Sequence, residues 1–177
     1  FASDAITKEY LVTKIPAGIS PQEAASIPVA YMTAHYALRN IGRLTAGESV
    51  LIHAAAGGVG LAAIEVAHSV GATVFATAGS KLKRRLLSML GIDPQNIFDS
   101  RDIDSLRAVR TRTNGRGIDV VLNSLPGQWI NRSLELLAAH GRFLEIGKID
   151  IYQNRQLGLL PFQDNLTYSA IDLDRLF

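Results

Sequence analysis

The sequence predicts a doubly wound α/β fold, in which helices cover both faces of a parallel sheet. Two observations predict it. From about residue 49, short apolar runs alternate with helical patterns, and these runs are almost continuously apolar or β-branched. Such strands are buried on both faces, and regular strand–helix alternation joins them by right-handed crossovers. The expected strands are 49–54, 73–78, 96–99, 118–123 and 142–147, with a sixth at 166–172.

Four helices are expected between these strands, and glycine marks their ends. Gly71, Gly91 and Gly141 each fall where a helix should end in a left-handed residue. The pair Asn114-Gly115 marks a fourth helix end in the same way. The expected helices are 58–70, 80–90, 104–112 and 127–139.

The first forty residues follow a different pattern. Residues 6–16 (ITKEYLVTKIP) have the composition of one or two strands of another sheet. The segment Ser20-Pro21-Gln22-Glu23 is a capping box with proline at the first helical position, so a helix begins there. Pro28 should break that helix, and a second one is expected over about 29–41.

Length and composition favour a single folded domain. The chain has 177 residues, of which 47% are apolar and 19% charged, and this argues against disorder. Because it opens with Phe1 and shows no leader, we expect a piece of a longer polypeptide. No apolar run reaches membrane-spanning length, and no nucleic-acid recognition motif accompanies the basic clusters. The absence of cysteine excludes thiolate zinc sites and fits a reducing, cytoplasmic location.

A glycine-rich loop, AAAGGVG at 54–60, follows the first strand and opens a helix. Glycines let the backbone approach a diphosphate, and the amides at the helix start then point at the anion. At the first strand–helix crossover, this loop predicts a dinucleotide-binding (Rossmann) fold with strand order 3-2-1-4-5-6.

The end of the second strand favours NADPH over NADH. Enzymes that use NAD usually place Asp or Glu there to accept from the ribose 2′-hydroxyl. This chain instead has GSKLKR at 79–84, with no carboxylate. A small hydroxyl and cations suit a 2′-phosphate, and the helix dipole would otherwise disfavour cations at a helix start. Two charge-assisted hydrogen bonds at a half-exposed site would favour NADPH by roughly ten- to a thousandfold.

Four segments occur in a characteristic order: HAAAGGVGLAAIEVA, VFATAGSKLKR, GRGIDVVLNSL and GRFLEIGKID. Together they resemble the enoyl reductase domains of type I polyketide synthases and animal-type fatty acid synthases. Those domains belong to the zinc-free quinone-oxidoreductase branch of the medium-chain dehydrogenase/reductase superfamily. The segment IPVAYMTAHYAL is similar to the linker helix of that family, so the resemblance covers essentially the whole chain.

The resemblance implies NADPH-dependent reduction of a trans-2-enoyl group, carried by a phosphopantetheine arm on an acyl carrier protein. It also implies that residues 1–28 are the end of a GroES-like substrate domain with its linker, and that 29–177 form the NADP-binding domain. Since little of the substrate domain is included, we expect a fragment that binds NADPH but lacks full activity. The edge strand 166–172 is expected to pair in a homodimer.

The resemblance also implies roles for individual residues. Lys148 matches the proton donor of the family, and Asp172 matches its acidic partner. A lysine just beyond a strand lies where open α/β sheets bind ligands, and it can stabilise charge that develops on a thioester oxygen. The expected cofactor contacts are Gly57, Gly58 and Val59 with the diphosphate, Ser80, Lys83 and Arg84 with the 2′-phosphate, and Thr33 and Asn123 near the nicotinamide.

The histidines and the tryptophan are expected to have structural roles. His53 lies within the first strand and is expected to pack in the core. His35, His68 and His140 show no ligand spacing, so no metal site is expected. Trp129 is expected to pack at the start of a helix.

Two other functions remain open. One is a free-standing quinone or enone reductase of the same superfamily, which the presence of carrier and ketosynthase domains in the parent polypeptide would exclude. The other is a non-catalytic module that binds a nucleotide for structural or regulatory reasons. Replacing Lys148 and Asp172 in the parent would separate these, because a non-catalytic module has no turnover to lose.

Overall fold

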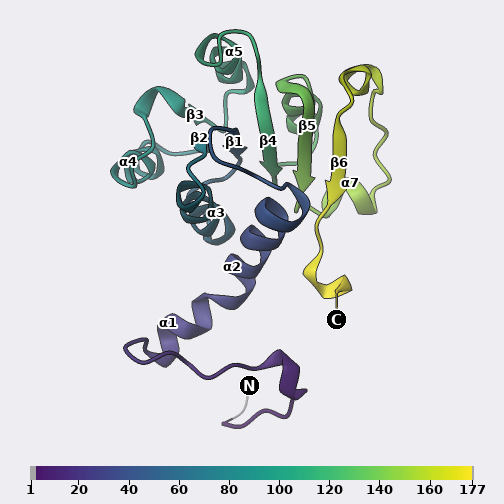
Figure 1. The fold of residues 1–177 in the computed structure, drawn as a ribbon. Coiled ribbons are helices and arrows are strands. Elements are labelled where there is room, and N and C mark those ends of the chain that lie inside the picture. Colours follow the sequence, from purple (N-terminus) through teal and green to yellow (C-terminus); the bar gives the residue numbers. More distant parts are fainter. Residues whose placement is uncertain (1–2, 177) are drawn as a thin grey trace.

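The computed structural model describes residues 3–176 and is built around a six-stranded sheet (Figure 1). All neighbouring strands are parallel, in the order β3-β2-β1-β4-β5-β6. The predicted fold class and strand order are therefore confirmed. The strands are β1 (Ser49–Ile52), β2 (Thr73–Ala78), β3 (Ile97–Asp99), β4 (Ile118–Asn123), β5 (Leu137–Glu145) and β6 (Thr167–Ala170).

Helices cover both faces of the sheet, and short 3-10 turns complete several of the connections (Figure 1). The α2 helix continues without a break into one wider turn, Tyr36–Ile41. Two of these 3-10 turns, Ile103–Leu106 and Leu173–Arg175, each line a cavity. The helices are α1 (Pro21–Ser26), α2 (Pro28–His35), α3 (Gly58–Ser69), α4 (Lys81–Met89), α5 (Arg107–Arg112), α6 (Gln128–Leu134) and α7 (Ile149–Tyr152).

Each face of the sheet has its own core. Val50 and Ile52 of β1 are fully buried in the cluster that also contains the inner sides of α2, α3 and α4. Leu51, between them, faces the opposite cluster, where β4 and β5 pack against α5 and α6. Successive side chains of a strand point to opposite faces, so continuous apolar runs are what a sheet covered on both sides requires.

Three of the four predicted left-handed helix ends are confirmed. Gly71 and Gly91 have φ of +76° and +89°, and Asn114 and Gly115 have φ of +51° and +80°. The prediction for Gly141 is wrong, because the left-handed residue there is His140, with φ of +62°. It lies inside a strand rather than at the end of a helix.

The predicted helix 127–139 is correspondingly too long. α6 ends at Leu134, and β5 already begins at Leu137, which pairs with Ile118 of β4. The register between β4 and β5 then shifts, so that Val120 pairs with Arg142. The intervening residues of β5 form a bulge, which bends the strand where a glycine was read as a helix end.

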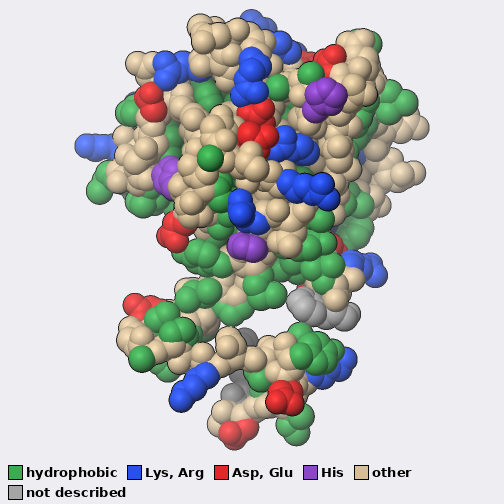
Figure 2. Space-filling model, viewed as in Figure 1, with side chains coloured by type: hydrophobic (Ala, Val, Ile, Leu, Met, Phe, Trp, Pro, Cys, Tyr) green, Lys and Arg blue, Asp and Glu red, His purple; other side chains and the backbone are tan. Residues whose placement is uncertain are grey.

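The prediction of strands within residues 6–16 is also wrong. This segment contains one 3-10 turn, Glu9–Leu11, and otherwise irregular backbone with exposed side chains. A strand requires a neighbour that completes its ladder of hydrogen bonds, and no strand of the described residues pairs with this segment. In the space-filling view these residues form part of a lobe below the main body, with apolar side chains on its surface (Figure 2).

The predicted capping box is present at the start of α1. The Glu23 amide donates to Ser20 Oγ at 3.3 Å, and the Ser20 amide donates to Glu23 Oε2 at 2.8 Å. Within residues 3–176, no helix is long and apolar enough to cross a membrane.

Candidate cofactor and active site

The glycine loop lies at the carboxyl edge of the sheet, between β1 and α3. Gly57 is the N-cap residue of α3, and no side chain caps this helix end. Gly57 and Gly58 are exposed, whereas Val59 is half-buried. A twelve-residue helix thus begins with accessible backbone next to residues that have no β-carbon. This is the arrangement that binds a diphosphate.

Gly60 is needed for packing in this loop. A β-carbon at this position would lie 2.5 Å from the carbonyl oxygen of Ala55, inside van der Waals contact. A β-carbon at Gly58 would meet only the Ala30 side chain, at 4.0 Å. The fold therefore requires glycine at position 60, whereas a side chain at position 58 would fit.

Gly60→Ala is expected to lower the free energy of unfolding by about 1–3 kcal/mol, because backbone must move to admit the methyl group. Urea unfolding followed by circular dichroism measures this change. Gly58→Ala is the matched control and should leave the unfolding free energy within about 0.5 kcal/mol of the unsubstituted chain. Equal losses in the two variants would contradict the assignment of the close contact to Gly60.

The corner beyond β2 holds the residues predicted for the 2′-phosphate. Ser80 is the N-cap of α4, and its Oγ accepts from the Lys83 amide at 3.2 Å. The Lys83 side chain is exposed, and no ion pair holds its ammonium within the described part of the chain. Arg84 is engaged elsewhere, because its guanidinium donates to the Ala78 carbonyl at 2.9 Å and lies 2.8 Å from the Asp99 carboxylate. The geometry favours Ser80 and Lys83 over Arg84 as phosphate contacts.

Arg101 is a basic residue at this corner that sequence reasoning missed. It follows β3 and is exposed, and its Nε lies 3.3 Å from where a β-carbon of Gly79 would be. The predicted strand order contained the relevant signal, since it puts the residues after β3 beside those after β2. A guanidinium here adds a third group, with Ser80 and Lys83, suited to a phosphate.

Lys148 and Asp172, predicted as catalytic residues, form an ion pair. Lys148 Nζ lies 2.8 Å from Asp172 Oδ1, and the more exposed Asp174 has Oδ2 at 3.9 Å. The hydrogen bond raises the pKa of Lys148 above its usual value and lowers that of Asp172. Both groups are therefore charged at neutral pH.

A cavity of about 340 Å³ brings residues from distant parts of the sequence together. Lys148 and Asp172 line it together with Thr33 of α2 and Val59 of α3. Two residues predicted to contact the cofactor thus share one cavity with both residues predicted to be catalytic. The cavity lies at the same edge of the sheet as the glycine loop.

Asn123 and Glu145 end the neighbouring strands β4 and β5 and are buried. Asn123 Nδ2 donates to Glu145 Oε2 at 2.6 Å, and the Gly147 amide donates to Glu145 Oε1 at 2.7 Å. Burial raises the pKa of Glu145 to about 7. Sequence reasoning missed Glu145, because β5 also contains the polar residues His140 and Arg142 and nothing in the local pattern marks the glutamate as buried.

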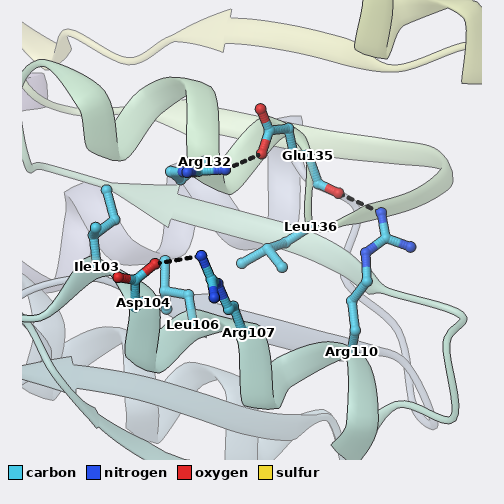
Figure 3. Close-up of a pocket in the computed structure, with 8 residues that line it drawn as sticks. All are labelled: Ile103, Asp104, Leu106, Arg107, Arg110, Arg132, Glu135 and Leu136. Carbon is cyan, nitrogen blue, oxygen red and sulfur yellow. Dashed lines mark hydrogen bonds and ion pairs between the residues drawn. The ribbon is translucent and has the colours of Figure 1, made fainter.

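A second hollow, of about 410 Å³, lies between the Ile103–Leu106 turn, α5 and the end of α6 (Figure 3). Three arginines line it, and each has a partner within the hollow. Arg107 pairs with Asp104, Arg132 pairs with the Glu135 carboxylate, and Arg110 donates to the Glu135 carbonyl. None of the residues predicted to bind the cofactor or to be catalytic lines this hollow, whereas four of them line the cavity at Lys148, which is therefore the candidate site.

Comparison with known proteins identifies the family. The sequence model of the zinc-binding dehydrogenase family matches residues 58–171. The chain is 46% identical to the nucleotide-binding subdomain of the enoyl reductase domain of PpsC from Mycobacterium tuberculosis. That structure superposes with a TM-score of 0.78, over 84% of this chain and 82% of that one. The chain belongs to the enoyl reductase domains of polyketide synthases.

Two further relatives of this chain are much longer than it is. The CurK enoyl reductase is 42% identical, with a TM-score of 0.83 over 93% of this chain and 48% of that one. The lovastatin diketide synthase of Aspergillus terreus is 47% identical over 174 residues, which is 98% of this chain. The chain spans only 7% of the length of that synthase.

The name of the matching family implies zinc, but the residues of this enoyl reductase chain do not fit a zinc site. Cysteine is absent from the sequence. Across residues 3–176, no group of three or more His, Asp or Glu side chains gathers as a metal ion would require. The glycine loop, by contrast, has the exposed helix start and the close packing that a dinucleotide needs.

Proposed function

We propose that this chain is the nucleotide-binding part of an NADPH-dependent enoyl reductase within a polyketide synthase. The substrate class is a trans-2-enoyl thioester, tethered to an acyl carrier protein by a phosphopantetheine arm. The observation that carries the proposal is the single cavity that joins the start of α3 to the Lys148–Asp172 ion pair. A cofactor on the glycine loop and a substrate beside Lys148 would therefore meet.

In this proposal Lys148 stabilises charge and donates a proton, and Asp172 holds Lys148 in place. NADPH, when bound, supplies the hydride that is added to the β-carbon. Negative charge then develops on the thioester oxygen, and the Lys148 ammonium stabilises it as a charged hydrogen-bond donor. Asp172 holds the ammonium through the 2.8 Å contact and keeps it protonated. Lys148 can then donate its proton as the product forms.

Ser80, Lys83 and Arg101 select NADPH by binding the 2′-phosphate. Gly57, Gly58 and Val59 bind the diphosphate, and Thr33 lies at the nicotinamide end of the cavity. The absence of a carboxylate at 79–84 supports this preference, because a carboxylate there would repel the phosphate. The relatives favour a synthase domain over a free-standing quinone reductase.

The test is a fluorescence titration of the 177-residue chain with NADPH and with NADH. NADPH is expected to bind at least about tenfold more tightly, because charge-assisted hydrogen bonds to the 2′-phosphate are worth about 1.5–3 kcal/mol each. Lys83→Met should weaken NADPH about tenfold and leave NADH unchanged.

Lys81→Met, on the same exposed turn of α4, is the matched control and should leave both affinities unchanged. Equal affinity for the two nucleotides would contradict the choice of NADPH. Failure of both to bind would contradict the proposed function.

The domain boundaries and the homodimer are part of the same proposal. Residues 1–28 represent the end of the substrate domain with its linker, and 29–177 represent the NADP-binding domain. Two features support this division: the exposed irregular segment before α1 and the sheet that fills the rest of the chain. β6 pairs only with β5 among the described strands, so its other edge is open to a second copy.

A further inference from the structure

The position of Lys148 is set by polar contacts rather than by apolar packing. Lys148 immediately precedes α7, a helix of four residues, which is too short to be stable by itself. The apolar side chains of α7 do not anchor it, because Ile149, Ile151 and Tyr152 are 58%, 42% and 70% exposed. Its one buried side chain is Asp150.

Asp150 ties α7 to the loop that follows β4. Its Oδ2 accepts from the Gly127 amide at 2.9 Å, and Arg155 binds its other oxygen. Gly127 begins the connection into α6, with φ of +74°. This contact holds the residues after Lys148 against the end of the neighbouring strand.

Glu145 ties the residues before Lys148 to the same loop. Its two carboxylate oxygens accept from the Gly147 amide and from Asn123 Nδ2. Asn123 is itself held by Leu125, which donates its amide to Asn123 Oδ1 at 3.1 Å and accepts from Nδ2 at 2.9 Å. Every polar atom of this buried pair has a partner.

We propose that Asn123, Glu145 and Asp150 act together as a clasp that holds Lys148 beside Asp172. The clasp joins the two connections that leave β4 and β5, and Lys148 is carried between its two anchor points, Gly147 and Asp150. These three are positioning residues, because they act on Lys148 through the backbone. The proposal rests on the proposed function for its catalytic consequence, but not for the hydrogen bonds themselves.

Glu145→Gln tests the clasp with little change of shape. The amide places an N–H donor where a carboxylate oxygen accepted, so either the Gly147 amide or Asn123 loses its partner. In the chain, hydrogen exchange of the donor that loses its partner, either the Gly147 amide or the Asn123 side-chain amide, should become at least tenfold faster. In the full-length polypeptide that carries the chain, kcat for enoyl thioester reduction should fall at least tenfold, with the Kd of NADPH unchanged within threefold.

The double variant Glu145→Gln with Asn123→Asp is designed to restore the Gly147 contact. The carboxylate introduced at position 123 accepts from the side-chain amide introduced at position 145. The oxygen of that side-chain amide is then free to accept from the Gly147 backbone amide, whose exchange should stay within threefold of the unsubstituted protein. The Leu125 carbonyl loses its donor, Asn123 Nδ2, in this variant, so kcat is expected to recover only in part. The exposed Glu135→Gln is the matched control and should change neither.

Exchange of both donors, the Gly147 amide and the Asn123 side-chain amide, and kcat all within twofold of the unsubstituted protein in Glu145→Gln would overturn the proposal. If Glu145→Gln does not fold, Asp150→Ala decides in its place, because it removes both oxygens of that carboxylate. The Gly127 amide is then the one observed, with the same limits on exchange and kcat. A full-length Lys148→Met variant with normal turnover would contradict the proposed function instead, and the exchange rates would still decide whether the clasp exists.

Discussion

Replacing Lys148 by methionine in the full-length polypeptide is expected to lower kcat for enoyl thioester reduction by about a hundred- to ten-thousandfold. The substitution removes the charge that faces the developing negative charge, together with the proton that the product requires. The Kd of NADPH should remain within threefold, because in the proposed reaction Lys148 contacts the substrate and not the cofactor. Steady-state kinetics, with NADPH oxidation followed by absorbance, measure the change.

The two neighbouring carboxylates provide the matched comparison for this prediction. Asp172→Asn removes the partner at 2.8 Å and should lower kcat at least tenfold, whereas Asp174→Asn removes one at 3.9 Å that is 91% exposed. Asp174→Asn should therefore leave kcat within twofold. Equal effects of the two variants would show that Lys148 is not held by Asp172 in the working enzyme.

The second large effect concerns stability and comes from two buried groups with opposite pH dependence. His53 is held between Thr77 and Ser133, and burial lowers its pKa from 6.5 to about 3. As pH falls from 6.5 to 3, the unfolded chain binds a proton that the folded chain does not. This removes about 5 kcal/mol of stability over that range.

Glu145 has the opposite effect, because burial raises its pKa from 4.5 to about 7. As pH rises from 4.5 to 7, the unfolded chain releases a proton that the folded chain retains. Stability therefore falls by about 3 kcal/mol over that range. Between pH 4.5 and 6.5 the slopes from His53 and Glu145 nearly cancel.

Replacing one of the two groups should reveal the pH dependence of stability that the other group causes. His53→Gln is expected to lose stability as pH rises from 4.5 to 7, whereas Glu145→Gln is expected to lose stability as pH falls below 6.5. Urea unfolding at pH values from about 4 to 8 measures both changes. The exposed His68→Gln is the control and should follow the unsubstituted chain. Identical pH profiles for all of these variants would contradict the burial of both groups in solution.

The parallel sheet could be predicted from the sequence because its signals are local. Continuous apolar runs identify strands that are covered on both faces, and Gly71 and Gly91 end helices where only a left-handed residue fits. The same reasoning failed at Gly141 and within 6–16. Gly141 lies in a bulge of β5, and glycine often marks a bulge as well as a helix end. Residues 6–16 have the composition of a strand, but no strand among the described residues lies beside them to pair with.

The candidate site could be predicted only in part. The glycine loop and the cations after β2 are contiguous motifs, so their chemistry can be read along the chain. Lys148 and Asp172 came from the resemblance of short segments to a known family. The contact between them depends on β5 and β6 being neighbours, since 24 positions separate them in sequence.

By itself, the sequence determined the fold class and the place of the glycine loop, because strands, helices and the loop are each marked by residues close together in the chain. The order of the strands followed from these elements, because right-handed crossovers and a glycine loop after the first strand are typical of the dinucleotide-binding fold. Only the tertiary structure decided that Arg84 binds Asp99, that Arg101 lies over Gly79, and that Glu145 is buried against Asn123. These contacts join segments whose spacing is set by the packing of the whole sheet. A side chain's partner and its pKa both follow from that packing, and no local pattern encodes them.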